Sequence, residues 1–407
     1  MASETAGTAR FGRKRDAILA AAQDIIHRRG LKAMTFADVA ERVGLNPTSI
    51  SYYFKKKEDL ALACLLAAAE RLQAMLCEAE HGRDEAARLR RLFEAFFAHH
   101  RAVRFGDESP LPSFGEIRAL EEPYRSIARD AFADLARRVR ALFEGPSFSH
   151  HGRKAKTALA HLLLEQIFWA MGWLHQYDVD DYPRVLERTC DIYFGGLAAS
   201  GAVWRGDVLD LPPQRRSAGD PSREDFLVAA TRLFNQVGYR AASVERISAE
   251  LNVTKGSFYH HHEAKEELAD ACFRRSIDIE RRAQRRALDA GGAQYEKLDL
   301  AVSTLVGFQL SESGPLAREW LLTALPDALR ASLTERLDRV VNRFASMIAD
   351  GYADGSIRAV DPLIAAQMLK VTINAAAEGP TWVRTLSRAD APALYARPTL
   401  MGVFAGA

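Results

Sequence analysis

Two short stretches of the chain gather hydroxyl, aromatic and basic side chains. The first, "NPTSISYYFKKKEDL", runs from Asn46 to Leu60, and the second, "TKGSFYHHHEAKEEL", runs from Thr254 to Leu268, 208 positions later. Hydroxyl and aromatic groups can contact phosphate oxygens and the edges of bases, and lysine can neutralise a phosphate. These residue types indicate contact with a nucleic acid, and their repetition predicts two such surfaces in one chain.

The repeat extends well beyond these two stretches. With a shift of 208 positions, residues 18–64 align with residues 226–272 without a gap. Gly30 falls on Gly238, and alanines and helix-start residues also coincide. Because unrelated helical segments rarely keep such residues in place over this length, the sequence indicates an internal duplication.

Each copy is predicted to contain two short helices joined by a turn. In the first copy, Thr35 opens one helix with Asp38 as its capping partner, and Gly44 ends that helix. Asn46 caps the next helix, with Pro47 in its first turn, where a missing N–H is harmless. This pattern is typical of a helix-turn-helix, whose second helix can enter the major groove of DNA.

Both copies resemble the N-terminal DNA-binding domain of TetR-type regulators. In that family a small hydroxyl residue opens the second helix. The third helix reads roughly V-[ST]-x-[GA]-[ST]-[LIF]-Y-x-[HY]-F, and K-[ED]-[ED]-L follows. The second copy, "VTKGSFYHHHEAKEEL", matches closely, except that His262 replaces the usual aromatic residue. The first copy, "LNPTSISYYFKKKEDL", has Pro47-Thr48 at the usual pair and Ser51 at the common tyrosine position.

The residues predicted to contact DNA are Lys14 on the first helix, residues along the third helix of each copy, and residues at the starts of the second and fourth helices, where backbone N–H groups favour phosphate. In the first copy they are Lys14, Thr35, Asn46, Pro47, Thr48, Ser49, Ser51, Tyr52, Tyr53 and Lys57. In the second copy they are Ser243, Thr254, Lys255, Gly256, Ser257, Tyr259, His260, His261 and Lys265.

Two of these groups have alternative interpretations. The Tyr52-Tyr53 pair could form a packing corner, but the repeat and the helix caps favour DNA contact. The run His260-His261-His262 could bind a metal ion. Successive helical residues point about 100° apart, so three in a row cannot easily share one ion. Solvated or groove-facing histidines are therefore favoured, and the sequence predicts no metal site and no cofactor.

The composition of the chain limits the remaining possibilities. At 407 residues, with 48% hydrophobic and 27% charged residues, it is typical of a soluble protein with two or more domains. Four scattered cysteines without C-x-x-C argue against a zinc module or a disulfide framework. The apolar stretch "ALAHLLLEQIFWAMGWL" is interrupted by polar residues, so we expect a buried helix and no membrane contact. No catalytic motif occurs, and we expect a cytoplasmic, nucleoid-associated protein rather than an enzyme.

Helical periodicity along the whole chain predicts an all-α fold made of two similar halves. Each half is expected to hold an N-terminal helix-turn-helix domain and a helical regulatory and dimerisation domain, which makes the chain a tandem duplication of a TetR-like unit. The expected boundaries are 1–60 and 61–204 for the first half, 205–222 for a linker rich in Pro, Gly and Arg, and 223–268 and 269–407 for the second half.

The resemblance implies that the regulatory domains sense a small molecule, and their aromatic content fits an apolar pocket. Such aromatic sets also occur in ordinary cores, so both interpretations stay open. The residues predicted to line a pocket are Phe97, His100, Trp169 and Trp173 in the first half, and Phe308 and Trp320 in the second. The ligand would be an unknown small apolar compound.

Together these features predict a sequence-specific DNA-binding transcriptional regulator, a ligand-responsive repressor that reads a double-stranded operator with two helix-turn-helix units. The alternative is a ligand-binding helical protein in which one or both units no longer read DNA. A helical enzyme with a polar site that the sequence does not reveal is a third class. We expect the two halves to pair within one chain as a pseudo-dimer, although pairing of each half with a second chain, and further self-association, stay open.

Two differences between the halves bear on this expectation. In TetR-like proteins the final two helices of each unit form a four-helix bundle with the partner unit. The segments predicted for this bundle in the first half, 154–177 and 183–199, have a regular helical pattern. The corresponding end of the second half carries Pro392 and Pro398. Pro398 would cost about 3 kcal/mol inside a helix unless the helix bends or restarts there. In addition, residues 10–60 carry eleven Lys and Arg against six acids, whereas residues 223–268 carry six against seven. The first unit is therefore expected to dominate non-specific DNA binding.

Overall fold

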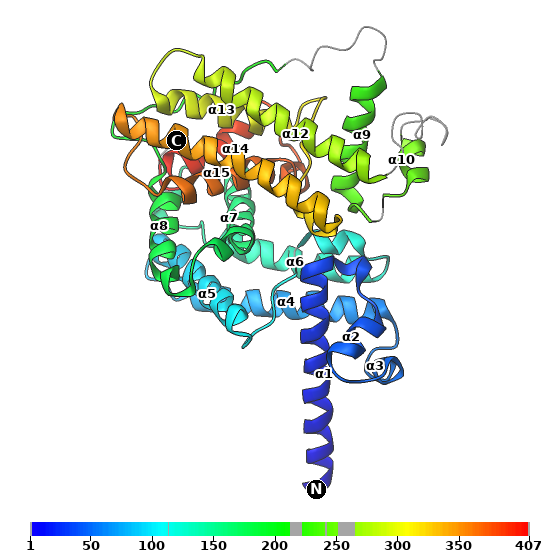
Figure 1. Ribbon diagram of the computed structural model, residues 1–407. Coiled ribbons are helices and arrows are strands. Elements are labelled where there is room, and N and C mark those ends of the chain that lie inside the picture. The colour runs from blue at the N-terminus through cyan, green and yellow to red at the C-terminus, as the bar shows by residue number, and fades with distance from the viewer. Residues whose placement is uncertain (1, 113, 212–221, 241, 251–264, 406–407) are drawn as a thin grey trace. The chain divides into compact units, whose positions relative to one another are not determined.

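The computed structural model describes residues 2–112, 114–211, 222–240, 242–250 and 265–405 (Figure 1). The chain forms two compact units, one made of Met1–His81 with Glu94–Val139 and the other of Gly82–Phe93 with Arg140–Ala407. Within the described residues the elements are helices, with a single isolated bridge between Ala198 and Ile357. The all-α prediction is therefore confirmed.

The first unit contains the first helix-turn-helix. Its elements are α1 (Ala2–Arg29), the 3-10 turn η1 (Leu31–Ala33), α2 (Phe36–Arg42), α3 (Pro47–Tyr53), α4 (Lys57–Glu80), the later part of α5 (Glu85–Phe105), η2 (Phe114–Ala119) and most of α6 (Tyr124–Ala141). Ile18, Ala22 and Ile25 are almost fully buried, as their spacing on one face of a helix requires. Helices α2 and α4 pack on this face (Figure 1).

The second unit contains the rest of the first half and the whole described part of the second. Its longer helices are α7 (Arg153–Trp173), α8 (Tyr182–Gly195), α9 (Ser222–Val237), α10 (Val244–Glu250), α12 (Lys265–Leu288), α13 (Gln294–Gln309), α14 (Asp327–Ala353) and α15 (Pro362–Ala376). Its shorter elements are η3 (Pro146–Phe148), η4 (Leu174–Gln176), η5 (Val179–Asp181), η6 (Glu319–Ala324), α16 (Gly379–Trp382), η7 (Pro392–Ala396) and α17 (Arg397–Met401).

The duplication is visible in equivalent contacts as well as in helix bounds. Cys64 of α4 directs its Sγ at the carbonyl oxygen of Leu19 at 3.9 Å, and Cys272 of α12 directs its Sγ at that of Leu227 at 3.7 Å. Both members of the second pair lie 208 positions after those of the first. The two helix-turn-helix domains therefore share their internal packing where both are described.

The C-terminal segment carries its two prolines in a helix that includes a π-helical turn. Residues Pro392–Ala396 form a π-helical turn, and α17 then begins with Pro398 in its first turn. Ala391, Ala396 and Arg397 all have helical backbone conformations, with φ of −58°, −72° and −54°, so the helix continues from the π-helical turn into α17. The N–H of Arg397 donates to the carbonyl oxygen of Pro392, five residues earlier. The helix at Pro398 thus includes a widened turn, and it does not restart there.

The first residues of the predicted linker are bound along α13. The backbone N–H groups of Arg205 and Gly206 both donate to Oδ2 of Asp299, at 2.9 and 3.1 Å. The N–H of Leu209 donates to Oγ1 of Thr304 at 2.8 Å. Residues 205–211 are thus part of the second unit, whereas the remainder of the predicted linker, 212–221, lies outside the described residues.

By length and composition alone, α4 is apolar enough to cross a membrane, and half of its most apolar window is buried. This is weak evidence for a membrane span, because the core helix of a soluble protein passes the same test. The stretch in α7 that the sequence analysis singled out is largely buried, as predicted.

Candidate nucleic-acid interface

The starts of α2 and α3 are capped as the sequence predicts. Oγ1 of Thr35 accepts from the N–H of Asp38, and Oδ2 of Asp38 accepts from the N–H of Thr35, both at 3.1 Å. Oδ1 of Asn46 accepts from the N–H of Ser49 at 2.8 Å, and Pro47 occupies the first turn of α3. Gly44 makes the turn between the helices with φ of +64°, a conformation that favours glycine. These local bonds fix the entry and the direction of α3.

Helix α3 buries one face and leaves the other accessible. Ile50 is fully buried and the following Phe54 is 5% exposed, whereas Tyr52 is 67% exposed. Of the other predicted contact residues, Asn46, Pro47 and Thr48 are exposed, and Ser49, Ser51 and Tyr53 are partly exposed. The hydroxyls of Thr48 and Ser49 both donate to Oδ1 of Asn46, each at 2.7 Å. The accessible face therefore presents oriented hydroxyl groups and an aromatic ring, which suit phosphates and base edges.

Sequence reasoning missed one aromatic residue of this surface. Phe11 of α1 stacks on Tyr53 with ring centroids 4.7 Å apart, and it meets Tyr52 edge-on at 6.0 Å. Tyr53 therefore packs against Phe11, whereas the ring of Tyr52 is largely accessible, and its contact with DNA stays a prediction. The signal was present in the sequence, since Phe11, Ile18 and Ile25 repeat at seven-residue spacing along one helical face.

The lysine that opens the fourth helix of each copy makes the same contact in both. Nζ of Lys57 donates to the carbonyl oxygen of Lys32 at 2.9 Å, and Nζ of Lys265 donates to that of Arg240 at 3.3 Å. Burial lowers the pKa of both ammonium groups. Each lysine therefore anchors the loop that precedes the helix-turn-helix, and each retains two further N–H donors for a phosphate. Lys14, in contrast, is exposed on α1.

The second copy is described only in part. Ser243 is exposed, and its Oγ accepts from the N–H of Arg246 at 3.2 Å, as Thr35 does with Asp38. Because Arg246 has no carboxylate, it cannot return a bond to the backbone N–H of the cap residue. The remaining predicted contacts, which are Thr254, Lys255, Gly256, Ser257, Tyr259, His260 and His261, lie outside the described residues.

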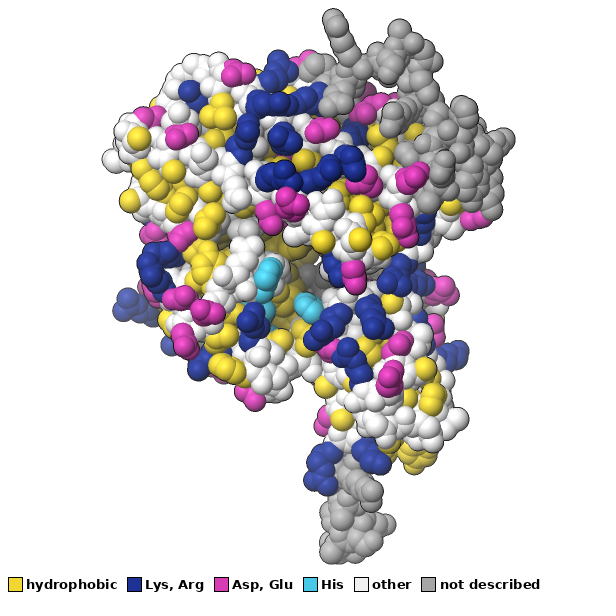
Figure 2. All heavy atoms as spheres, in the orientation of Figure 1, with side chains coloured by type: hydrophobic (Ala, Val, Ile, Leu, Met, Phe, Trp, Pro, Cys, Tyr) yellow, Lys and Arg dark blue, Asp and Glu magenta, His cyan; other side chains and the backbone are white. Residues whose placement is uncertain are grey.

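Basic side chains also occur away from the helix-turn-helix domains. Figure 2 shows Lys and Arg side chains gathered over the region of α12 and α14. The exposed arginines of these helices are Arg274, Arg281, Arg285, Arg286 and Arg339. Two of them, Arg274 and Arg339, pair with an acid one turn earlier on the same helix, so part of this charge is neutralised locally.

The residues predicted to line a ligand pocket are distributed over both units. Phe97 and His100 belong to the first unit, and each is less than a tenth exposed. Trp173 belongs to the second unit and is buried, with its ring edge-on to Tyr177 at 6.0 Å. Trp169 and Trp320 are partly exposed, and Phe308 is buried. The pocket itself stays a prediction.

The interior of the second half contains a buried charge cluster that the sequence did not predict. Lys370 of α15 pairs with Glu280 of α12 and with Oε1 of Glu319, the latter at 3.0 Å. Burial opposes the charge of Lys370, but the two carboxylates outweigh it and raise its pKa. Burial raises the pKa of Glu280. The three residues come from separate helices, so no local sequence pattern announces them.

In the first copy a capped helix-turn-helix presents an accessible hydroxyl and aromatic face, as expected of a DNA-binding protein of the regulator class. The family described as "Bacterial regulatory proteins, tetR family" matches residues 18–64 and again residues 226–272. Both helix-turn-helix domains therefore match the DNA-binding domain of the tetR family, which the chain carries twice. Because this family consists of transcriptional regulators, the prediction of a non-enzyme is confirmed.

Three similar proteins each match less than half of the chain. The HTH-type transcriptional repressor DhaR of Mycobacterium sp. (strain GP1) is 28% identical over 144 residues, which are 35% of this chain and 72% of that protein. The Transposon Tn10 TetC protein of Escherichia coli is 43% identical over 54 residues, 13% of this chain and 27% of that protein. Among solved structures, apo AibR is 22% identical, with a TM-score of 0.36, over 44% of this chain and 97% of that one.

Proposed function

We propose that this regulator is a ligand-responsive repressor in which one chain reads one operator, with its two halves paired as an internal pseudo-dimer. The observation that carries the proposal is the set of contacts between the halves inside the second compact unit. There α15 packs on α7 and α8, and α17 packs on α8 (Figure 1). The name of the relative DhaR supports the repressor role.

The polar contacts between the halves are not symmetric. Nε2 of Gln166, on α7, donates to the carbonyl oxygen of Met368 at 2.9 Å and to Oγ1 of Thr372 at 3.2 Å, both on α15. With the shift of 208 positions, Thr372 corresponds to Leu164, which has no acceptor in its side chain. Two first halves brought together in the same way would leave Gln166 without this hydroxyl partner.

The charged contacts at the edges of the paired halves are also asymmetric. Nη1 of Arg358 pairs with Asp191 at 2.8 Å, and its Nε donates to the carbonyl oxygen of Gly196 at 2.7 Å. The residue 208 positions before Arg358 is His150, and the residue 208 positions after Asp191 is Thr399. A bundle of two second halves would therefore lack the acid that Arg358 meets here.

Backbone hydrogen bonds join the halves as well. The N–H of Leu197, just after α8, donates to the carbonyl oxygen of Leu400 at 2.8 Å. The N–H of Arg358 donates to the carbonyl oxygen of Leu197 at 3.0 Å, and the N–H of Ala199 donates to that of Ser356 at 3.1 Å. Such bonds need a close approach of two main chains, so they favour one fixed arrangement of the halves.

Internal pairing would explain why the chain carries the domain twice. A helix-turn-helix reads one half-site, and two are needed for a two-part operator. Because the two recognition segments differ in sequence, the preferred operator should be non-palindromic. A small apolar ligand would release DNA only if it binds better to the state in which the spacing of the two helix-turn-helix domains does not match the two half-sites. This function would place the protein in the cytoplasm, with the nucleoid.

The test is the number of chains per operator. DNA selected from a random pool by the full chain is bound at low protein concentration, and light scattering gives the mass of the free and the bound protein. We expect a free chain of 45.1 kDa and one chain per operator. Tyr52→Ala and Tyr259→Ala should each weaken specific binding. Two chains per operator at every concentration would refute internal pairing.

The same variants separate the alternative function. If Tyr259→Ala leaves operator affinity unchanged while Tyr52→Ala abolishes binding, the second unit does not read DNA. The ligand is sought with a library of apolar compounds, by tryptophan fluorescence and by operator release. Compounds that bind without changing operator affinity would refute the regulatory part of the proposal.

A further inference from the structure

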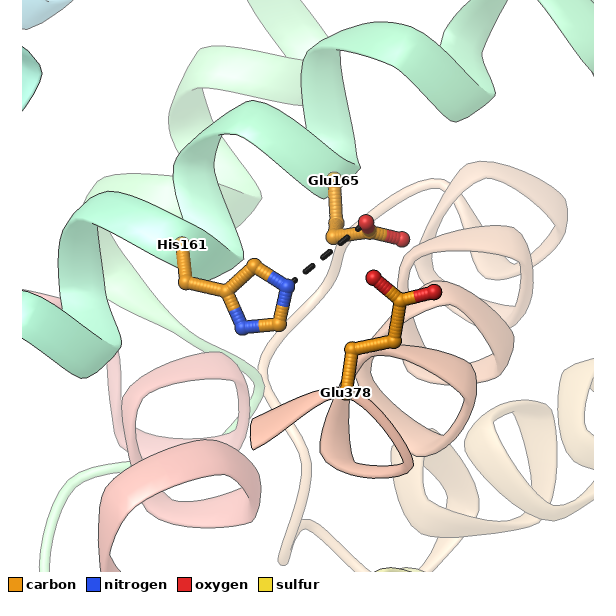
Figure 3. Close-up of side chains that lie close together, drawn as sticks. All are labelled: His161, Glu165 and Glu378. Atoms are coloured by element: carbon orange, nitrogen blue, oxygen red, sulfur yellow. Dashed lines mark ion pairs between the residues drawn. The ribbon is translucent and has the colours of Figure 1, made fainter. Parts of the chain in front are cut away.

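A polar cluster of one buried and two partly exposed side chains lies where α7 of the first half meets the end of α15 in the second half (Figure 3). His161 and Glu165 stand four residues apart on α7, so both side chains leave the same face of that helix. Glu378 comes from the short connection between α15 and α16. One ligand atom from each residue lies within 4.8 Å of the others. The set combines one imidazole with two carboxylates, as many metal sites do.

His161 is held in an orientation that leaves one nitrogen facing the carboxylates. The side chain is fully buried, and its Nδ1 lies 2.9 Å from the hydroxyl of Tyr395. Its ring stacks on Trp382 with centroids 4.7 Å apart. A histidine that binds a metal through one nitrogen usually has the other fixed by such a hydrogen bond.

The second nitrogen of His161 lacks a hydrogen-bond partner. Nε2 is buried without one, and Oε1 of Glu165 is 3.6 Å away. That distance is too long for a hydrogen bond. Buried polar atoms in native proteins are nearly always paired, so an orphaned imidazole nitrogen aimed at two carboxylates calls for a group between them.

Arg318 supports the two carboxylates from another side. Its Nη2 donates to Oε2 of Glu165 at 3.2 Å, and its Nη1 pairs with Oε1 of Glu378. The oxygen of Glu165 that faces His161 is the other one, Oε1. Arg318 therefore orients both acids and offsets one of their two negative charges. A divalent ion could join without displacing the guanidinium, but the nearby positive charge would weaken its binding.

We propose that His161, Glu165 and Glu378 bind one divalent first-row transition-metal ion, with Zn²⁺ as the ion that this mixed nitrogen and oxygen set fits best. Because the ligands come from both halves, the ion would tie the first half to the second. The sequence gives little sign of this site, because His161 and Glu378 are far apart in the chain and only the four-residue spacing on α7 is local. The proposal does not depend on operator reading.

The test uses the full chain after treatment with a chelator, with Co²⁺ as a visible probe and Zn²⁺ as its competitor. We expect one Co²⁺ per chain, visible absorption bands that Zn²⁺ removes, and a higher melting temperature in the presence of either ion. His161→Gln and Glu165→Gln should each weaken the binding at least tenfold. His175→Gln removes an exposed histidine of the same unit and should leave the binding unchanged.

A second measurement covers the case in which His161→Gln disturbs packing on Trp382. X-ray absorption of the zinc-loaded wild-type chain should show one imidazole, oxygen ligands and no sulfur. Two or more imidazoles would assign the ion to another histidine group, such as His150-His151, and would overturn the proposal. Absence of saturable binding at millimolar Co²⁺ would also overturn it, and the cluster would then be an ion-pair network alone. Neither measurement involves DNA, so the result is separate from the test of operator reading.

Discussion

Replacing Gly402 by alanine should break a close approach between the two halves. Gly402 follows α17 in the second half with φ of 91° and ψ of 148°, a region that is essentially restricted to glycine. A Cβ placed there would lie 2.3 Å from the carbonyl oxygen of Phe194 and 2.7 Å from the carbonyl carbon of Gly195, both at the end of α8. These are backbone atoms, so no rotation of a side chain can relieve the clash.

The expected loss in the free energy of unfolding is the sum of two costs. Holding a non-glycine residue in this backbone region costs about 1–3 kcal/mol, and forcing backbone to shift in a packed site costs about 1–3 kcal/mol more. Gly402→Ala should therefore lower the free energy of unfolding by about 2–6 kcal/mol in total. Gly355→Ala is the matched control, because Gly355 also has a positive φ, +73°, but a Cβ there meets nothing within 4 Å. Its cost should be about 1–2 kcal/mol.

The assay is equilibrium unfolding in urea, followed by tryptophan fluorescence. All five tryptophans lie in the second unit, so the signal reports on the unit that contains the paired halves: Trp169, Trp173, Trp204, Trp320 and Trp382. Light scattering at low concentration shows whether the variant forms a dimer of two chains. If Gly402→Ala unfolds at the same urea concentration as Gly355→Ala, the close contact between α8 and the end of α17 does not stabilise the protein, and the argument for fixed internal pairing fails.

Three further predictions concern reactivity, pH and salt. In the folded protein an alkylating reagent at pH 8 should modify Cys77 alone, because the other three cysteines are buried and burial raises the pKa of Cys64 to about 12. Two or more adducts detected by mass spectrometry before unfolding would contradict this prediction. A hydrogen bond from Lys154 is the main cause that lowers the pKa of Asp390 from 3.8 to about 2. The stability that Asp390 adds relative to Asp390→Asn should thus be complete above pH 3.8 and disappear as pH falls toward 2 in thermal melts, whereas a constant difference would argue against the contact. Lys14→Gln should reduce the slope of log affinity against log salt by about 0.9 if that lysine neutralises one phosphate, and an unchanged slope would exclude it.

Much of the helix-turn-helix could be predicted from sequence because its signals are local. The caps at Thr35 and Asn46 bond to N–H groups three residues away, so residue type and spacing are enough to place them. An irregularity of the last helix near Pro398 could also be expected, because the covalent ring of proline removes an N–H and crowds the preceding turn. The role of Phe11 was equally readable from its seven-residue spacing to Ile18, although only the structure placed its ring on Tyr53.

Other features needed the folded chain. Lys57 and its equivalent Lys265 were expected to bind phosphate, but only the structure revealed that each donates to a carbonyl oxygen 25 residues earlier. Residues 205–211 looked like free linker, since a segment without periodicity gives no sign of the side chains of α13 that accept its N–H groups. The ion cluster around Lys370 likewise joins residues from three separate elements.

The sequence by itself determined that this protein is all-α, that its DNA-binding domain occurs twice, and where the third helix of the first copy begins. Those facts depend on periodicity, on caps within one helical turn and on identity at a fixed shift of 208 positions. The tertiary structure alone decided which side chain of one half meets which of the other, as with His161 and Tyr395 or Arg358 and Asp191. Such contacts are set by how helices pack in three dimensions, and residues far apart in the chain carry no spacing rule that could reveal them.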